Sequence, residues 1–157
     1  MPVIKSEFIS VYPFSQESGH VKILLLKRKS GLLLGDTWQA VHGKIEDDET
    51  AWEAAFRELR EKTSFTLELL YNLDPEVLYD AQNDCVQIIP AFAAKMRAYS
   101  TPKLSAEHID FEWLPFEDAL KRVIWDNQRH RIREIVEMLA DGFPGEKLRI
   151  IKKNEKA

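Results

Sequence analysis

The sequence contains a single cysteine, and none of its apolar runs approaches the roughly 18 residues of a membrane-spanning helix. A lone cysteine cannot form an internal disulfide, which favours a reducing compartment. The N-terminal segment MPVIKSEFIS also lacks the apolar block and the small-residue cleavage site of a signal peptide. Together these absences predict a cytoplasmic protein with no membrane partner.

Charge and histidine spacing exclude further classes of protein. The net charge is −4 and the isoelectric point is about 5.6, a balance that argues against binding along a nucleic-acid backbone. The four histidines show no metal-ligand spacing, so zinc is not expected, and there is no glycine-rich Walker loop. A small phosphorylated ligand is still allowed, because it needs only a few placed cations or a metal.

The chain has no internal repeat, and no Gly/Ser- or Pro-rich linker divides it. A length of 157 residues suffices for one domain, which at this size buries roughly 68–70% of the surface of the unfolded chain. We expect the domain to span residues 1–145, followed by a solvated and partly disordered tail over residues 146–157.

Strand-like and helix-like segments do not alternate strictly along the chain, which predicts a mixed sheet covered by helices. An irregular connection is predicted over 71–84, with a turn at Asp74-Pro75. Strands are predicted over 3–13, 21–27, 38–41, 65–70, 86–96 and 109–114. Helices are predicted over 50–63, over 115–123 and from a cap at Asp126, the last with an apolar stripe of Ile132, Ile135, Val136 and Leu139.

The helix predicted over 50–63 is acidic. Thr50 and Glu53 form a capping-box pattern at its start. At 100° per residue Glu58 and Glu61 share one face, where two like charges repel unless a cation lies between them, and carboxylate oxygens suit magnesium or manganese. Acidic residues opposite an apolar stripe are usually a solvated face, and spacing alone favours that interpretation. The stripe here consists of Trp52, Ala55, Phe56 and Leu59.

A longer pattern surrounds this helix. It runs Gly, five residues, Glu, seven residues, Arg-Glu-aliphatic, one residue and Glu, and it is supplied by Gly43, Glu49, Arg57, Glu58, Leu59 and Glu61, with Phe65 at a final apolar position. These are the spacings of the Nudix box, so the sequence resembles the Nudix hydrolase family. The segments WQAVHGKIEDDET and WDNQRHRI resemble its branch of dATP pyrophosphohydrolases and dihydroneopterin triphosphate pyrophosphatases.

The resemblance implies an α/β/α sandwich, in which a mixed β-sheet lies between helices. It implies a hydrolase that uses Mg²⁺ or Mn²⁺ to cleave a pyrophosphate linkage in a deoxynucleoside triphosphate or dihydroneopterin triphosphate. The products would be the monophosphate and pyrophosphate. By the same resemblance Glu58, Glu61 and Glu107 are the catalytic residues and, with the backbone carbonyl of Gly43, the metal ligands. Family members often dimerise, so a homodimer remains open, although no segment predicts an interface.

Two further roles rest on the resemblance. Glu107 is selected over Glu112 because the family places a glutamate six residues before a tryptophan, here Trp113. Glu49 and Arg57 are implied to form a structural ion pair that ties the loop to the helix.

The sequence also departs from the family pattern. Asp48 and Ser64 replace glycines, and His42 replaces a small residue before Gly43. Lys62 is the more serious change, because it stands where the family has a metal-binding glutamate, and a protonated lysine cannot ligate a cation.

Two outcomes are open at Lys62. Its ammonium group supplies one positive charge in place of a metal, which leaves one magnesium on Glu58, Glu61 and Gly43. Alternatively the site is inactive, and the domain binds nucleotides or a partner without turnover. We prefer the first because the rest of the ligand set is intact.

Four residues are candidates for binding the substrate: Arg28, Lys5, Trp38 and His42. Arg28 could meet a phosphate group, although a solvated strand end explains it equally well, and Lys5 is a weaker candidate of the same kind. Trp38 could stack on a base or a pterin ring, but a tryptophan is more often a packing residue. His42 could donate a hydrogen bond to the substrate or be a satisfied core histidine.

Overall fold

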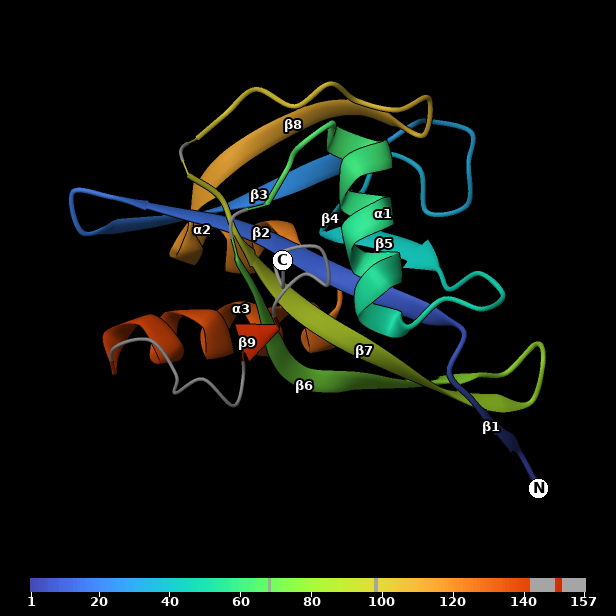
Figure 1. Cartoon of the computed structure of the whole chain (residues 1–157). Helices are drawn as coiled ribbons and strands as arrows, with labels where there is room; N and C mark the ends of the chain where they lie inside the picture. The colour runs from blue at the N-terminus through green and yellow to red at the C-terminus, as the bar shows by residue number, and fades with distance from the viewer. Residues whose placement is uncertain (68, 98, 142–148, 151–157) are drawn as a thin grey trace.

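The computed structural model describes residues 1–67, 69–97, 99–141 and 149–150, which form nine strands and three helices (Figure 1). The helices are α1 (Ala51–Thr63), α2 (Phe116–Arg122) and α3 (Asp126–Ala140). The strands are β1 (Val3–Lys5), β2 (Phe8–Glu17), β3 (His20–Arg28), β4 (Trp38–Gln39), β5 (Val41–Lys44), β6 (Leu69–Asp80), β7 (Cys85–Lys95), β8 (His108–Pro115) and β9 (Arg149–Ile150).

All strands belong to one mixed sheet. Its main path is β4-β3-β2-β7-β6-β9, while β8 also pairs with β3, β5 with β2 and β1 with β7. Strands β1 and β2 run parallel to β7, and the other pairs are antiparallel. Strand β2 pairs with β5 through residues 8–11 and with β3 through residues 14–17, so one long strand carries both neighbours on the same edge.

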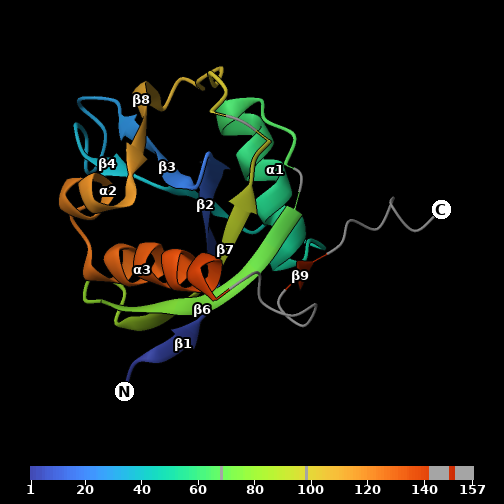
Figure 2. The same ribbon diagram turned by 90° about the vertical axis from the view of Figure 1, so that its left-hand side faces the viewer.

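The sheet lies between two helical layers, with α1 on one face and α2 and α3 on the other (Figure 2). Alternate side chains of β2 supply both cores, because successive residues of a strand point to opposite faces. Ile9 and Val11 pack in the core under α1, whereas Tyr12 and Phe14 pack in the core under α2 and α3. This architecture confirms the predicted α/β/α sandwich with a mixed sheet.

The structure corrects the bounds of several predicted elements. The first predicted strand is two strands, β1 and β2, and β2 continues to Glu17, so the turn is confined to Ser18 and Gly19, which both have positive φ. The strand predicted over 38–41 is divided into β4 and β5. Helix α3 begins at Asp126 as predicted, but its N-cap residue is Trp125.

The predicted irregular connection over 71–84 is wrong, because most of it belongs to β6. The pairing of β6 with β7 shifts register between Leu73 and Glu76, so Asp74-Pro75 forms an irregularity inside the strand instead of ending it. Proline lacks a backbone donor and is therefore tolerated in a sheet at such irregular positions. The strand then continues to a hairpin turn at residues 81–84.

The C-terminal part of the chain is described only at β9, which pairs with β6. The rest of the predicted tail over 146–157, and the predicted domain limit at residue 145, lie outside the described residues. None of the helices described is long and apolar enough to cross a membrane.

Candidate active site

Helix α1 begins with a capping box and is flanked by two residues in the left-handed conformation, which together fix the orientation of its acidic face. The Thr50 hydroxyl accepts a hydrogen bond from the Glu53 N–H (3.2 Å), and the Glu53 carboxylate accepts one from the Thr50 N–H (2.9 Å), which confirms the capping box. Asp48 before the helix and Ser64 at its end both have φ of +62°. Glycine adopts this left-handed conformation without strain, which explains why a glycine is usual at these two positions.

Gly43 allows α1 to pack closely against β5. A Cβ atom at Gly43 would lie 2.0 Å from the Cδ atom of Glu58 and 2.4 Å from its Cγ atom. No side chain is compatible with these distances, so the glycine makes room for the Glu58 carboxylate between helix and strand. Glu58 is only 7% exposed, and the predicted solvated face of α1 is therefore partly buried.

Arg57 donates hydrogen bonds to three carboxylates of the loop and helix. It donates two hydrogen bonds to Glu49, from Nε to Oε1 (2.7 Å) and from Nη2 to Oε2 (3.0 Å), as the predicted ion pair requires. Its Nη1 group donates to Glu58 Oε1 (2.9 Å) and Glu61 Oε2 (3.2 Å). These hydrogen bonds raise the pKa of Arg57, chiefly through Glu49, and the Arg57 hydrogen bond lowers the pKa of Glu49.

Lys62 points into the acidic group and not into solvent. Its Nζ atom lies 3.4 Å from Glu58 Oε2 and 3.2 Å from Glu107 Oε2, and it donates a hydrogen bond to the backbone carbonyl of His42. Lys62 is 9% exposed. One ammonium group therefore occupies the position on which two carboxylates and a carbonyl converge.

Arg28 completes this arrangement at the end of β3. Its Nη1 atom lies 3.9 Å from Glu107 Oε2, and its Nε donates to the carbonyl of Leu33 (2.7 Å). Partial burial alone would raise the pKa of Glu107, but the charge and hydrogen bond of Lys62, with the charge of Arg28, lower it below its ordinary value. We call the six side chains Arg28, Arg57, Glu58, Glu61, Lys62 and Glu107 the charged cluster.

Two neutral histidines border the charged cluster. Burial, together with the positive charges of Lys62 and Arg28, lowers the pKa of His42 to about 4. Burial and Lys62 also lower the pKa of His108 to about 4. The His42 ring stacks on Phe8 (5.5 Å between centroids), and its Nδ1 atom lies 3.3 Å from the Ser10 hydroxyl. Both histidines are therefore uncharged at neutral pH.

The structure does not bring every predicted site residue to this cluster. Lys5 is exposed in β1, where its charge acts on Asp80 at the end of β6. Trp38 packs against the core of the opposite face, and the Arg122 guanidinium lies 4.8 Å from its ring centroid. Glu112 pairs with Arg122 (3.0 Å), so of the two candidate acids only Glu107 contacts Lys62.

A cavity of about 190 Å³ lies next to the charged cluster, on the face of the sheet covered by α3. Its walls include His42, Gln39 and the buried carboxyl group of Glu76. His42 connects the two regions, because its ring lines the cavity while its carbonyl contacts Lys62. Gln39 provides a second connection through a contact of 3.3 Å with His108, the residue after Glu107.

The sequence matches the NUDIX domain family over residues 9–135, which includes both faces of the sheet and the whole charged cluster. The chain belongs to the Nudix family. The resemblance predicted from the sequence is thereby confirmed.

Individual relatives lie at low identity. The chain is 26% identical over 144 residues to the asymmetrical bis(5'-nucleosyl)-tetraphosphatase of Caenorhabditis elegans, covering 90% of this chain and 99% of the relative. It is 27% identical over 128 residues to an octanoyltransferase of Myxococcus xanthus, but spans only 35% of that protein's length. The E. coli dihydroneopterin triphosphate pyrophosphohydrolase shares the fold, with a TM-score of 0.72, 21% identity and coverage of 87% of this chain and 99% of that one.

One backbone carbonyl beside the acidic residues was not predicted from the sequence. It is the carbonyl of His42, which accepts a hydrogen bond from Lys62. That the Gly43 carbonyl ligates a metal stays a prediction. The signal in the sequence was the glycine itself, which marks a close approach to the backbone without saying which atom is presented. The structure assigns Gly43 to the packing of Glu58.

The residues of the cluster fit a divalent ion only in part. Hard carboxylate oxygens of Glu58 and Glu61 converge on one Arg57 nitrogen, and such oxygens are the ligands that magnesium prefers. The inner position between Glu58, Glu107 and the His42 carbonyl is filled by Lys62. Within the described part of the chain, no three Asp, Glu, His or Cys side chains form an arrangement ready to hold a metal.

Proposed function

We propose that this Nudix domain hydrolyses a pyrophosphate linkage in a small cytoplasmic triphosphate, a deoxynucleoside triphosphate or dihydroneopterin triphosphate, and releases pyrophosphate. The observation that carries the proposal is the convergence of Glu58, Glu107 and the His42 carbonyl on one cation position, with Arg28 beside it. The E. coli neighbour of this fold acts on dihydroneopterin triphosphate, and the C. elegans relative is a tetraphosphatase, so both names belong to the same class of chemistry.

In this proposal Glu58 and Glu61 would hold one magnesium or manganese ion, which supplies positive charge to the phosphate oxygens of the substrate. The Lys62 ammonium provides a second, permanent cation from the protein itself. Arg28, partly exposed at the edge of the cluster, is placed to donate hydrogen bonds to a phosphate group. Lys62 and Arg28 thereby stabilise negative charge that develops during the reaction.

Glu107 is the favoured general base. Both oxygens of Glu58 are engaged, one by Arg57 and one by Lys62, and the side chain is buried. The Glu107 side chain is 49% exposed and can therefore contact water. A water oxygen attacks phosphorus, its proton passes to Glu107, and the bond from phosphorus to the leaving pyrophosphate oxygen breaks.

The test is a screen of candidate substrates in which the reaction products are identified. Purified protein with magnesium, and separately with manganese, is given nucleoside triphosphates, dinucleoside polyphosphates and dihydroneopterin triphosphate, and pyrophosphate release is measured. The proposal predicts pyrophosphate from at least one triphosphate and a loss of at least tenfold in kcat for Glu107→Gln at unchanged stability. Absence of turnover with every substrate and both metals would overturn it.

A second candidate is a nucleotide-binding module without turnover. It is favoured by one observation, which is that Glu58, Glu61 and Glu107 already pair with cations of the protein. Calorimetry separates the two candidates, because a ligand that binds and is recovered intact supports the module, and a ligand recovered as monophosphate and pyrophosphate supports the hydrolase.

A further inference from the structure

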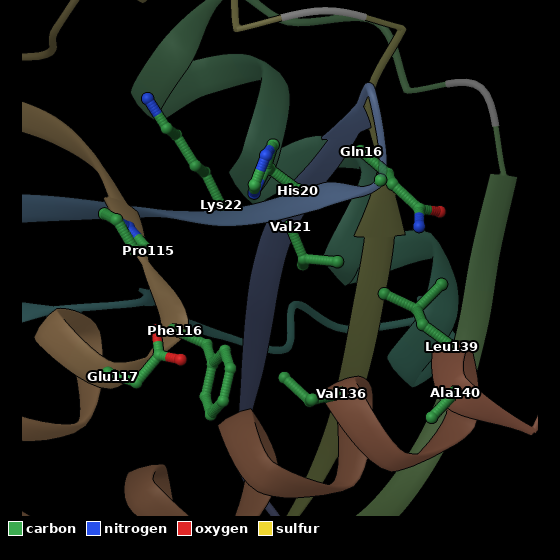
Figure 3. Close-up of a pocket in the computed structure, with 11 residues that line it drawn as sticks. Gln16, His20, Val21, Lys22, Pro115, Phe116, Glu117, Val136, Leu139 and Ala140 are labelled. Atoms are coloured by element: carbon green, nitrogen blue, oxygen red, sulfur yellow. The ribbon is translucent and has the colours of Figure 1, made fainter.

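We compare two of the cavities that lie on the face of the sheet that carries α2 and α3. The larger, of about 370 Å³, lies between the β2–β3 hairpin, the start of α2 and the end of α3 (Figure 3). Val21, Phe116, Val136 and Leu139 turn apolar side chains into it (Figure 3). None of its described lining residues has a buried polar atom that lacks a hydrogen-bond partner, so no unsatisfied group there points to a ligand.

The smaller cavity, which we call the Glu76 cavity, is different. Glu76 is 4% exposed, and its Oε2 atom accepts a hydrogen bond from the Tyr12 hydroxyl (3.1 Å). Its Oε1 atom is buried and has no hydrogen-bond partner among the residues described. The Oε1 atom of Gln128, from the first turn of α3, lines the same cavity and is also buried without a partner there.

Buried acceptors without donors are rare, because a polar group removed from water loses free energy unless it forms a hydrogen bond. Burial raises the pKa of Glu76, although the neighbouring Ser10 and Tyr12 hydroxyls act in the opposite direction. A ligand N–H that donates to Oε1 would stabilise the charged carboxylate. The Glu76 cavity is therefore built to receive hydrogen-bond donors.

The mouth of the Glu76 cavity is apolar. Leu34 and Leu78 are each 43% exposed there, and Trp125 is 52% exposed. Pockets that hold a whole drug-sized ligand usually measure roughly 300–1,000 Å³, so a volume of about 190 Å³ suits one planar ring system and not an entire nucleotide. His42 borders both regions, because its side chain lines the cavity and its carbonyl accepts a hydrogen bond from Lys62, so the cavity lies beside the charged cluster.

We propose that the Glu76 cavity binds the heterocycle of the substrate through a 2-amino-4-oxopyrimidine edge, the edge that guanine and pterin rings share. This edge presents a ring N–H and an adjacent amino group, which together match the Glu76 carboxylate. Adenine presents a ring acceptor beside its amino group, and that lone pair would face the carboxylate oxygen. This proposal names the substrate class of the proposed hydrolase. It rests on that function for the binding of the phosphate groups of the substrate.

The experiment is calorimetry with α,β-methylene triphosphates, which resist cleavage at the linkage in question. Four rings are compared: guanine, hypoxanthine, adenine and 2-amino-4-oxopteridine. Hypoxanthine differs from guanine only by the missing amino group. We expect guanine or pterin to bind about tenfold more tightly than hypoxanthine or adenine, a ratio typical of one bidentate contact. Whichever of guanine and pterin binds more tightly identifies whether the substrate is a guanine nucleotide or a pterin triphosphate.

Glu76→Gln tests the assignment to the carboxylate. The amide keeps the shape of the side chain but exchanges one acceptor for a donor, so the ratio of guanine to hypoxanthine affinity should fall to within about twofold of unity. Glu112→Gln is the matched control, because Glu112 pairs with Arg122 outside the cavity and should keep the ratio.

Several results would overturn the inference: no binding of any ring, equal binding of guanine and hypoxanthine, adenine bound as tightly as guanine, or a ratio that survives Glu76→Gln in a folded protein. The proposed function fails separately. A Glu76-dependent ratio without pyrophosphate release leaves the ring assignment standing, whereas pyrophosphate release without ring preference leaves only the hydrolase standing.

Discussion

The charged cluster and the Glu76 cavity meet at His42 but satisfy their polar groups in opposite ways. In the cluster each of the three carboxylates has a cation partner from the protein, and the Lys62 ammonium also takes up the His42 carbonyl. In the cavity one buried oxygen of Glu76 and one of Gln128, Oε1 in each case, have no partner among the described residues. Substitutions of the buried or partly buried cations Lys62 and Arg57 should therefore act strongly on stability, and substitutions in the cavity mainly on binding.

The largest effect on stability is expected at Lys62. Lys62→Met removes the cation from a buried carboxylate, and breaking a buried pair in this way costs about 3–5 kcal/mol. Lys62→Glu should be destabilised similarly without metal but regain stability with manganese. The measurement is denaturant unfolding with and without the ion. Lys121→Met on the exposed side of α2 is the control, and a loss below about 1 kcal/mol for Lys62→Met would contradict our account of the cluster.

The second largest loss of stability is expected at Arg57. Arg57→Lys keeps the charge but loses the planar fork that donates twice to Glu49. Since hydrogen bonds to charged groups contribute about 1.5–3 kcal/mol each, we expect a loss of about 2–3 kcal/mol. Urea titration measures it. If the variant unfolds at the same urea concentration as the parent, Arg57 does not hold the loop to the helix.

Acid should lower the free energy of unfolding, because two histidines beside the charged cluster are neutral in the folded protein. The folded pKa values of His42 and His108, both about 4, lie below the unfolded value of 6.5, so the unfolded chain binds more protons between these pH values. Their contribution is complete above pH 6.5 and is lost as the pH falls to 4, with a slope approaching about 1.4 kcal/mol per pH unit for each histidine. Unfolding free energies across this range provide the measurement. A slope unaffected by His42→Gln would contradict the prediction for His42.

A gain of stability is expected at the end of α1. Ser64 adopts φ of +62°, which a glycine adopts without strain, so Ser64→Gly should stabilise the protein by about 1 kcal/mol. The change leaves the cluster and cavity contacts intact. Thermal unfolding should show a higher midpoint, and a lower midpoint would mean that the Ser64 side chain makes a stabilising contact that outweighs the strain.

The smallest effect on stability is expected at the cavity mouth. Trp125 is 52% exposed, and Trp125→Ala should change the unfolding free energy by no more than about 0.5 kcal/mol. Ring binding should weaken by at least about fivefold, because stacking of a base on an aromatic side chain contributes about 1–3 kcal/mol. A variant that binds the preferred ring with parental affinity would place the ring elsewhere.

Features that depend on the local sequence pattern could be predicted from the sequence. The capping box of Thr50, the Glu49–Arg57 pair and the sandwich fold follow from spacing and from the Nudix box, and the structure contains all three. Strand β6 was missed because a register irregularity at Asp74-Pro75 depends on pairing with β7, which lies distant in the sequence. The contact between Lys62 and the His42 carbonyl depends on how α1 packs against β5, which residue spacing does not specify.

The Glu76 cavity was also not predicted. Its lining comes from β2, β4, β5, β6, β7, the loop before β4 and the start of α3, and no local motif connects Glu76 with Gln128. A buried glutamate in a strand has no sequence signature that separates it from an exposed one. Only the three-dimensional arrangement shows that two acceptors share one cavity.

The central claim is that the Lys62 ammonium serves as the inner cation of a working pyrophosphohydrolase. Its most direct test is pyrophosphate release as a function of magnesium concentration, with Lys62→Glu measured beside the parent. The account predicts a simple one-site dependence for the parent and a steeper dependence, on more than one ion, for the variant. A parent that needs two ions, or that releases no pyrophosphate at any magnesium or manganese concentration, would contradict it.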